Sequence, residues 1–166
     1  AVTSLDGKLY FVGGAANGNS ANLTERYDPV TNQWETLPQM SGPRYDLATA
    51  GLNGKLYAIG GQGLNSVEVF DPQSGQWSMG ASLPSEVDEC AAISVNGRIY
   101  LVGGRNPSNQ QINQVLEFDP GNNQWISKAA MPTARCGMKL ALFEDKLWAI
   151  GGNDGSDVNK VEIYDI

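Results

Sequence analysis

Residues 56–61 read LYAIGG, and this pattern of an aliphatic, an aromatic and two apolar residues before two glycines occurs four times in the 166-residue chain. The other copies are LYFVGG at 9–14, IYLVGG at 99–104 and LWAIGG at 147–152. An apolar run of four residues that stops at glycine is too short for a helix and indicates a buried β-strand. Four copies predict an array of structural repeats.

A two-residue turn signal precedes three of these four runs. The signals are Asp6-Gly7, Asn53-Gly54 and Asn96-Gly97. Such pairs favour hairpin turns in which both central residues have positive φ, so a strand should lie before each of them. The fourth run follows Glu144-Asp145, which is a weaker signal. The strands expected before the turns span residues 1–5, 47–52, 90–95 and 138–143.

Two further strands complete each repeat. After each double glycine, a polar loop leads to a strand with a terminal aromatic residue, and in three repeats the next strand carries a tryptophan. The aromatic residues are Tyr27, Phe70, Phe118 and Tyr164, and the tryptophans are Trp34, Trp77 and Trp125. Their spacing is always seven residues, whereas the preceding loop segment varies from nine residues (61 to 70) to 14 (104 to 118). Because pairing fixes register, the constant spans should be packed and the variable loops free for recognition.

The strand order gives each repeat two different ends. In an antiparallel unit of strands a to d, the a–b and c–d turns lie at one end. The b–c loop and the connector from strand d to the next repeat lie at the other end. We therefore expect one plain face with short turns and one loop face, which includes the connectors at residues 40–46, 83–89 and 131–137.

These features resemble kelch repeats, which form the four-stranded blades of β-propellers. The resemblance covers the whole chain and rests on the double glycines, the aromatic and tryptophan residues, and a period of 43 to 48 residues between second glycines (14, 61, 104 and 152). Residues 66–72 and 158–165 are most similar to the BTB-kelch subgroup, as are Pro43-Arg44 and Met131-Pro132 followed by Arg135.

The resemblance implies an all-β propeller with four four-stranded antiparallel blades, the last of which lacks its outer strand. We expect the blades at about residues 1–38, 44–81, 87–129 and 135–166. Kelch propellers commonly have five to eight blades, and repeats bury their apolar faces on neighbours. We therefore expect either part of a longer propeller or a ring completed by another copy; a closed ring of four blades with a borrowed strand is the less favoured arrangement.

Composition narrows the function classes. The net charge of −7 argues against nucleic acid or an anionic membrane as the main partner. The chain has no histidine, so it lacks the commonest general base and transition-metal ligand, and we expect no metal or cofactor. No apolar run reaches the length of a membrane span, and the first residues lack the features of a secretion signal. We expect a cytoplasmic chain.

Most of the repeated residues are expected to be structural. The glycines are not followed by a phosphate-binding pattern, and the tryptophans recur at one position per repeat, which indicates packing between blades. The glycines are Gly13, Gly14, Gly60, Gly61, Gly103, Gly104, Gly151 and Gly152. Cys90 and Cys136 are expected to be buried free thiols, with a disulfide or redox sensor as the alternative. Asn22-Leu23-Thr24 is a glycosylation sequon that matters only in a secreted protein.

The candidate binding residues lie on the loop face. In kelch proteins, residues of the connectors and b–c loops often bind partner peptides, so the resemblance suggests the same role here; a solvated or locally bonded side chain is the alternative for the arginines. The candidates are Arg44, Tyr45, Glu86, Asp88, Arg105, Asn106, Arg135, Asn153 and Asp154.

The first functional hypothesis is a non-catalytic module that binds a protein or peptide on the loop face. By resemblance it could be the substrate-recognition part of a ubiquitin-ligase adaptor or a cytoskeletal scaffold, and it could associate with itself to complete a ring. The alternative is a metal-free sugar enzyme of the epimerase type. That alternative rests on Glu86, Asp88 and Glu89, since paired carboxylates can divide acid and base roles.

Overall fold

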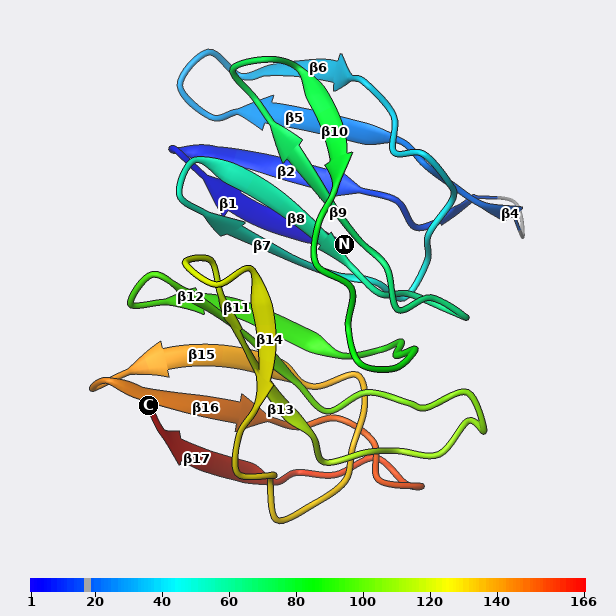
Figure 1. Ribbon diagram of the computed structural model, residues 1–166, viewed down its shortest axis with the longest axis vertical. Helices are drawn as coiled ribbons and strands as arrows, with labels where there is room; N and C mark the ends of the chain where they lie inside the picture. Colours follow the sequence, from blue (N-terminus) through cyan, green and yellow to red (C-terminus); the bar gives the residue numbers. More distant parts are fainter. Residues whose placement is uncertain (17–18) are drawn as a thin grey trace.

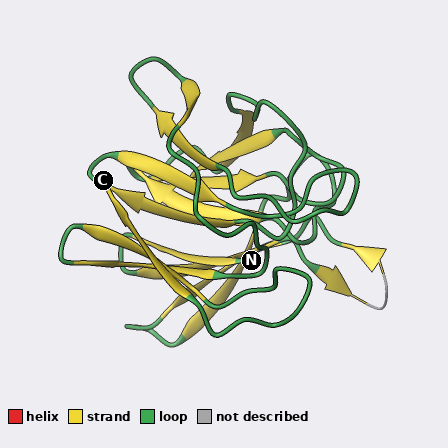
Figure 2. Ribbon diagram, turned by 90° about the horizontal axis from the view of Figure 1, so that it is seen from below, coloured by secondary structure: helices red, strands yellow, loops and turns green. Residues whose placement is uncertain are grey.

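The computed structural model describes residues 1–16 and 19–166, and every regular element in these residues is a β-strand (Figure 2). Within the same ranges, no helix has the length and apolar character that crossing a membrane requires. The strands form four antiparallel sheets, each built from consecutive parts of the chain, and one two-stranded hairpin. The hairpin lies in the first b–c loop and pairs β3 (Ala15–Ala16) with β4 (Asn19–Ser20); residues 17–18 of that loop lie outside the described residues.

The first two sheets have four strands each, in the order a to d. The first blade contains β1 (Val2–Leu5), β2 (Lys8–Val12), β5 (Thr24–Asp28) and β6 (Gln33–Leu37). The second blade contains β7 (Ala48–Leu52), β8 (Lys55–Ile59), β9 (Val67–Asp71) and β10 (Gln76–Met79).

The third sheet has four strands and the fourth has three, as the sequence predicts. The third blade contains β11 (Ala91–Val95), β12 (Arg98–Val102), β13 (Val115–Asp119) and β14 (Gln124–Ser127). The fourth blade contains β15 (Lys139–Phe143), β16 (Lys146–Ile150) and β17 (Val161–Asp165). Each strand a begins one residue later than expected.

The a–b turns all have the same backbone, including the one without glycine. Asn53 and Gly54 have φ of 51° and 72°, and Glu144 and Asp145 have φ of 49° and 56°. Two consecutive left-handed residues define the hairpin turn whose twist matches the flanking strands. The register of the fourth blade therefore imposes this turn on residues that do not favour it.

The blades are arranged as a β-propeller, with strand a of each blade innermost. Strand β7 contacts both β1 and β11, and β11 contacts β15. Figure 1 shows the blades in chain order, with the first and the fourth at opposite ends of the row. The inner strands line a channel of about 550 Å³, which Ala48, Ala91 and Lys139 border from three different blades.

The apolar cores lie between neighbouring blades. Ile59 and Val67 of the second blade share one core with Ile99 and Leu101 of the third. A second core joins the first and second blades, and a third joins the third and fourth blades. Each sheet thus buries apolar side chains against the next one, which is how repeat arrays are stabilised.

Two of the three strand-d tryptophans link neighbouring blades, and one does not. The Nε1–H group of Trp77 donates to the carbonyl of Pro38, and that of Trp125 donates to Ala81, each over 2.9 Å. Trp34 departs from the expected inter-blade packing: it is 58% exposed and stacks on Tyr27 of its own blade. Trp77 and Trp125 each contact the blade that precedes their own, and the described residues contain no blade before that of Trp34.

The two faces differ as the strand order predicts. In Figure 1 the short turns lie on the left, and the b–c loops and connectors lie on the right. The right-hand side is the loop face, and all nine candidate binding residues belong to its loops and connectors.

Candidate partner-binding face

An asparagine in each of the first three b–c loops holds the connector that follows. Nδ2 of Asn65 donates to the carbonyl of Leu83 over 3.3 Å, and the N–H of Leu83 donates back to the carbonyl of Asn65 over 2.8 Å. Asn113 makes the same pair of bonds with Met131. The b–c loop and the connector of one blade are therefore fixed to each other.

The sequon asparagine belongs to this set. Nδ2 of Asn22 donates to the carbonyl of Met40 over 3.3 Å. Asn22 lies five residues before Tyr27, as Asn65 lies five before Phe70, and Asn65 is not part of a sequon. The repeat thus accounts for Asn22 as a structural residue.

The double glycines let two connectors approach the backbone of one blade. Gly60 and Gly61 have φ of +61° and +109°, and the N–H of Gly61 donates to the carbonyl of Val87 over 3.0 Å. A Cβ atom on Gly60 would lie 2.6 Å from that carbonyl, and one on Gly61 would lie 2.9 Å from the carbonyl of Tyr45. No side chain fits in either place, so the connectors before and after the blade enclose this pair.

Arg44 is buried within the second blade. It is 4% exposed, and its Nε and Nη2 donate to Oε1 of Glu68 over 3.2 and 3.0 Å. Its Nη1 donates to the carbonyls of Gly60 and Ser66, each over 2.9 Å. The other carboxylate oxygen of Glu68 accepts from the N–H of Ser41 over 2.8 Å. The buried charges are thus paired and hydrogen-bonded.

Arg135 has the same position in the fourth blade. It is fully buried, and its Nη1 donates to the carbonyls of Gly151 and Lys160 over 2.8 and 3.1 Å. Its Nη2 lies 3.2 Å from Oε2 of Glu162. These contacts favour the locally bonded alternative for Arg44 and Arg135, since neither side chain reaches the surface of the loop face.

Arg105 joins two connectors on the loop face. Its Nε donates to Sγ of Cys136 over 3.2 Å, and its Nη1 lies 3.4 Å from Oε1 of Glu89. The backbones of Arg105 and Asp88 exchange two hydrogen bonds, over 2.8 and 3.2 Å. Burial raises the pKa of the Asp88 carboxyl, and the carboxylates of Glu89 and Asp46 raise it further against the opposing charge of Arg105. One cation thus lies among three carboxyl groups.

Both cysteines are buried free thiols, as expected. Burial raises the pKa of the Cys90 thiol to about 12. Burial also raises the pKa of Cys136, with help from Glu89 and against the effect of Arg105. Thiols with raised pKa values are poor nucleophiles at neutral pH, so both behave as core residues.

Asn106, Asn153 and Asp154 shape their own loops. Oδ1 of Asn106 accepts from the N–H groups of Ser108 and Gln110, each over 3.0 Å. Oδ1 of Asn153 accepts from the N–H of Gly155 over 2.9 Å. Side chains that bind the backbone two residues on are typical of tight turns. The polar atoms of these three residues are therefore largely engaged within the chain.

Tyr45 and Glu86 are the candidates with the fewest internal bonds. Tyr45 is half-buried and Glu86 is exposed, and neither side chain forms a hydrogen bond or ion pair in residues 1–16 and 19–166. Asp46, which sequence reasoning missed, is exposed beside Tyr45. The sequence signal for Asp46 was its position, because Asp46, Glu89 and Gly137 each end a connector of the repeat. In the structure all three have left-handed φ.

These three residues connect the blades around the channel. The N–H of Glu89 donates to the carbonyl of Asp46 over 2.9 Å, and the N–H of Gly137 donates to the carbonyl of Glu89 over 2.8 Å. The backbone is the same in each blade, whereas the side chains are an aspartate, a glutamate and a glycine. The loop face thus repeats its backbone and varies its chemistry.

A sequence model described as the KLHDC2/KLHL20/DRC7 Kelch-repeats domain matches residues 1–166. The chain belongs to the kelch-repeat family. The double glycines, the clamped connectors and the aromatic–tryptophan pairs described above are therefore features of a kelch array, and its blades are kelch repeats.

Several curated kelch proteins match part of the array. Human Kelch repeat and BTB domain-containing protein 13 is 47% identical over 64 residues, which is 37% of this chain and 14% of that protein. Human Kelch-like protein 33 is 40% identical over 62 residues, or 37% of this chain and 12% of that protein. An F-box/kelch-repeat protein of Arabidopsis thaliana is 38% identical over 61 residues, or 37% and 15%. The matched stretch is thus a small part of each relative.

Proposed function

We propose that this kelch array is a non-catalytic module that binds a protein or peptide on its loop face. The observation that carries the proposal is the contrast between backbone and side chains there. Hydrogen bonds from Asn65, Gly61 and their repeats fix the backbone, and the side chains at equivalent positions differ from blade to blade. A rigid frame that presents varied side chains is suited to recognition.

The charges on the loop face indicate the chemistry of the partner. Acidic residues outnumber basic ones on its connectors, which carry Asp46, Glu86, Asp88 and Glu89, and Glu89 pairs with Arg105 of the neighbouring b–c loop. Opposite charge speeds association and excludes wrong partners. We therefore expect a segment with basic side chains, for which Tyr45 supplies an aromatic contact.

The names of the relatives suggest a setting for this module. They combine kelch repeats with a BTB domain or an F-box. On that basis we propose that the array is the target-recognition part of a ubiquitin-ligase adaptor; a cytoskeletal scaffold is the second setting. Cosedimentation of the chain with actin filaments would favour the scaffold.

A peptide library tests the proposed face. Random peptides are selected on the 166-residue chain, and the binders are measured against Glu86→Lys and, as a matched charge reversal on the turn face, Glu144→Lys. Both glutamates are exposed. Binders rich in Lys or Arg that lose affinity only for Glu86→Lys support the proposal. Binders that lose affinity only for Glu144→Lys, or no binders at all, contradict it.

The sugar-enzyme alternative has one supporting observation, which is that burial and neighbouring carboxylates raise the pKa of the Asp88 carboxyl. The third carboxylate of that hypothesis, Glu86, is exposed. The test is to incubate the same protein with a panel of sugars. Turnover that is lost in Asp88→Asn would support the enzyme and contradict the non-catalytic binding module.

A further inference from the structure

In the described part of the chain, the loop face around the second blade has free polar side chains, whereas those of the third and fourth blades bond within the chain. We propose that this free part is a subsite that binds an arginine side chain of the partner. The subsite consists of Tyr45, Asp46, Gln62 and Glu86. The proposal rests on the function proposed above and names the chemistry of its partner.

Two backbone hydrogen bonds place these residues on both sides of one short loop. The N–H of Gln62 donates to the carbonyl of Tyr45 over 3.1 Å, so the first connector lies on one side. The N–H of Val87, which follows Glu86, donates to the carbonyl of Leu64 over 3.3 Å, so the second connector lies on the other side. The b–c loop of the second blade is therefore held between the two connectors that carry the subsite.

This b–c loop is the shortest in the array. From the second glycine to the aromatic residue it spans nine residues (61 to 70), against 13 in the first blade (14 to 27) and 14 in the third (104 to 118). Longer loops have more residues to extend beyond their blades. A segment bound across the second blade would therefore have a longer loop on each side, which can contact the rest of the segment.

The side chains of the subsite are available to a partner. Asp46, Gln62 and Glu86 are exposed and Tyr45 is half-buried. Within residues 1–16 and 19–166, none of the four side chains forms a hydrogen bond or an ion pair. A partner would thus displace water from these groups and would not have to break a bond inside the described chain.

The equivalent side chains of the third blade are engaged. Arg105 has the position of Gln62, directly after the second glycine. Its Nη1 donates to Oδ1 of Asn109 over 3.0 Å and lies 3.4 Å from Oε1 of Glu89, which has the position of Asp46. A ligand at this blade would have to compete with these internal contacts.

The polar side chains of the fourth b–c loop are engaged as well. Oδ1 of Asn153 accepts from Nε2 of Gln111 over 3.3 Å, and Nδ2 of the same asparagine donates to Oδ1 of Asp157 over 3.1 Å. Nζ of Lys160 donates to Oδ2 of Asp154 over 3.2 Å. This part of the loop face therefore serves as a support for the free part.

The free groups suit a guanidinium group. The arginine of the first connector, Arg44, is already paired with Glu68, so Asp46 and Glu86 can take a cation from the partner. A guanidinium can stack on the ring of Tyr45 while its N–H groups bind carboxylate and amide oxygens. A lysine ammonium is a compact point charge and does this less well. We therefore expect arginine rather than lysine at this place.

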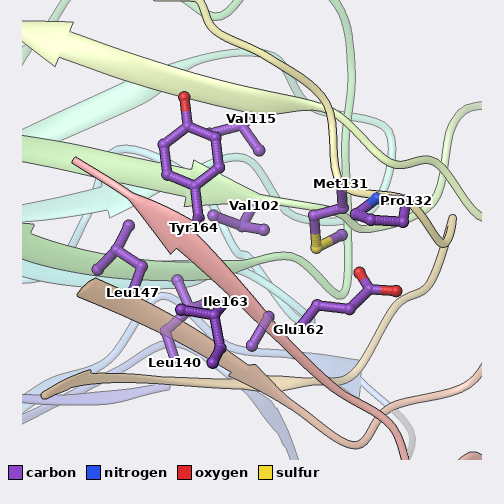
Figure 3. Close-up of a pocket in the computed structure, with 10 residues that line it drawn as sticks. Val102, Val115, Met131, Pro132, Leu140, Leu147, Glu162, Ile163 and Tyr164 are labelled. Carbon is purple, nitrogen blue, oxygen red and sulfur yellow. The ribbon is translucent and has the colours of Figure 1, made fainter.

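Three hollows elsewhere suit a cation less well. One of about 20 Å³ between the third and fourth blades has room for about one water, and Glu162 at its border (Figure 3) lies 3.2 Å from Arg135. A groove of about 380 Å³ along β10 reaches Glu68, which is paired with Arg44. Lys139 borders the channel and would repel a cation.

A double-mutant cycle with peptides from the library tests the subsite. Each arginine of the tightest binder is replaced by lysine, and the peptides are measured on the wild type, on Gln62→Ala and on Asp46→Asn. We expect one arginine whose replacement weakens binding to the wild type about fivefold or more. The same replacement should weaken binding to either variant less than about twofold, because its contact is already lost.

Both variants should keep the fold. Gln62 is exposed, and asparagine accepts the left-handed φ of 55° that Asp46 has. Asp154→Asn in the fourth blade is the matched control. It should change peptide affinity less than about twofold, because Asp154 is paired with Lys160 outside the subsite. Urea unfolding of each variant checks that its stability is retained.

Three results would overturn the subsite. They are binders that contain no arginine, equal losses from the lysine replacement on the wild type and on both variants, and a larger effect of Asp154→Asn than of Asp46→Asn. In each case, binders that still lose affinity for Glu86→Lys keep the protein-binding function. The absence of any binder would overturn the function and the subsite together.

Discussion

Arg44 donates two hydrogen bonds to the same carboxylate oxygen of Glu68, and both side chains are at most 4% exposed. The third blade has Val87 and Leu116 at these two positions, and both lie in one apolar core. The repeat therefore accepts either an ion pair or an apolar pair at this place. A charge without its partner would be buried and uncompensated.

The first prediction concerns this pair. Arg44→Val or Glu68→Leu alone should destabilise the chain by about 3–5 kcal/mol, because one buried charge remains unpaired. The double variant, which copies the third blade, should be more stable than either single variant. Urea unfolding measures the three free energies. The exposed pair Arg26–Glu35 is the control, and its removal should cost about 1 kcal/mol or less. Additive effects of Arg44→Val and Glu68→Leu would contradict the coupling.

A second prediction separates backbone strain from steric clash at glycine. Gly60 and Gly75 have φ of +61° and +68°, but a Cβ on Gly60 would meet a backbone carbonyl at 2.6 Å, whereas one on Gly75 would meet no atom within 4 Å. Gly75→Ala should cost about 1–2 kcal/mol from the left-handed conformation alone. Gly60→Ala should cost clearly more, since the connector must move. Equal losses in thermal unfolding would show that the connector yields freely.

A third prediction concerns acid. The N–H of Gln73 donates to Asp71 over 2.8 Å, and this bond, with Lys55 nearby, holds the pKa of the Asp71 carboxyl below its ordinary value of 3.8. A lowered folded pKa stabilises the chain above the unfolded pKa, and this contribution is lost as the pH falls through the folded pKa.

Asp71→Asn should therefore lower the urea midpoint at pH 7, and its difference from the wild type should shrink as the pH falls below about 3.8. Glu25→Gln is the control, because Glu25 is exposed and makes no side-chain bond in the described residues. A difference for Asp71→Asn that stays constant down to pH 2 would mean that its charge is not the cause.

The sequence predicts the fold well because the fold repeats. The spacing from Tyr27 to Trp34 recurs twice, and the structure places these residues opposite each other in every complete blade. The a–b turn of the fourth blade was harder to predict, since Glu144 and Asp145 do not favour positive φ. The register of the blade imposes this conformation on them.

The binding residues were harder to predict than the fold. An arginine in a connector near a variable loop suggests a ligand contact, and burial cannot be read from its position alone. The partner of Arg44 is 24 residues away on strand c. The sequence did contain a signal for this pairing. The connector has an arginine in the blades where strand c has a glutamate, and it has Val87 in the blade where strand c has Leu116. Comparison of the repeats with one another would have shown that these positions pair.

The last prediction uses the asparagine of the b–c loop, which occurs in all four blades and, among the described residues, holds a connector in three of them. Nδ2 of Asn113 donates to the carbonyl of Met131 over 2.9 Å, whereas Asn159, at the same position in the fourth blade, is exposed and makes no side-chain bond in the described residues. Asn113→Ala should therefore cost about 1 kcal/mol, the usual net value of one hydrogen bond. Asn159→Ala should change stability by less than about 0.5 kcal/mol. Equal losses in urea unfolding would mean that the asparagine stabilises its own loop rather than the connector, and the clamp would then no longer explain how the loop face is held rigid.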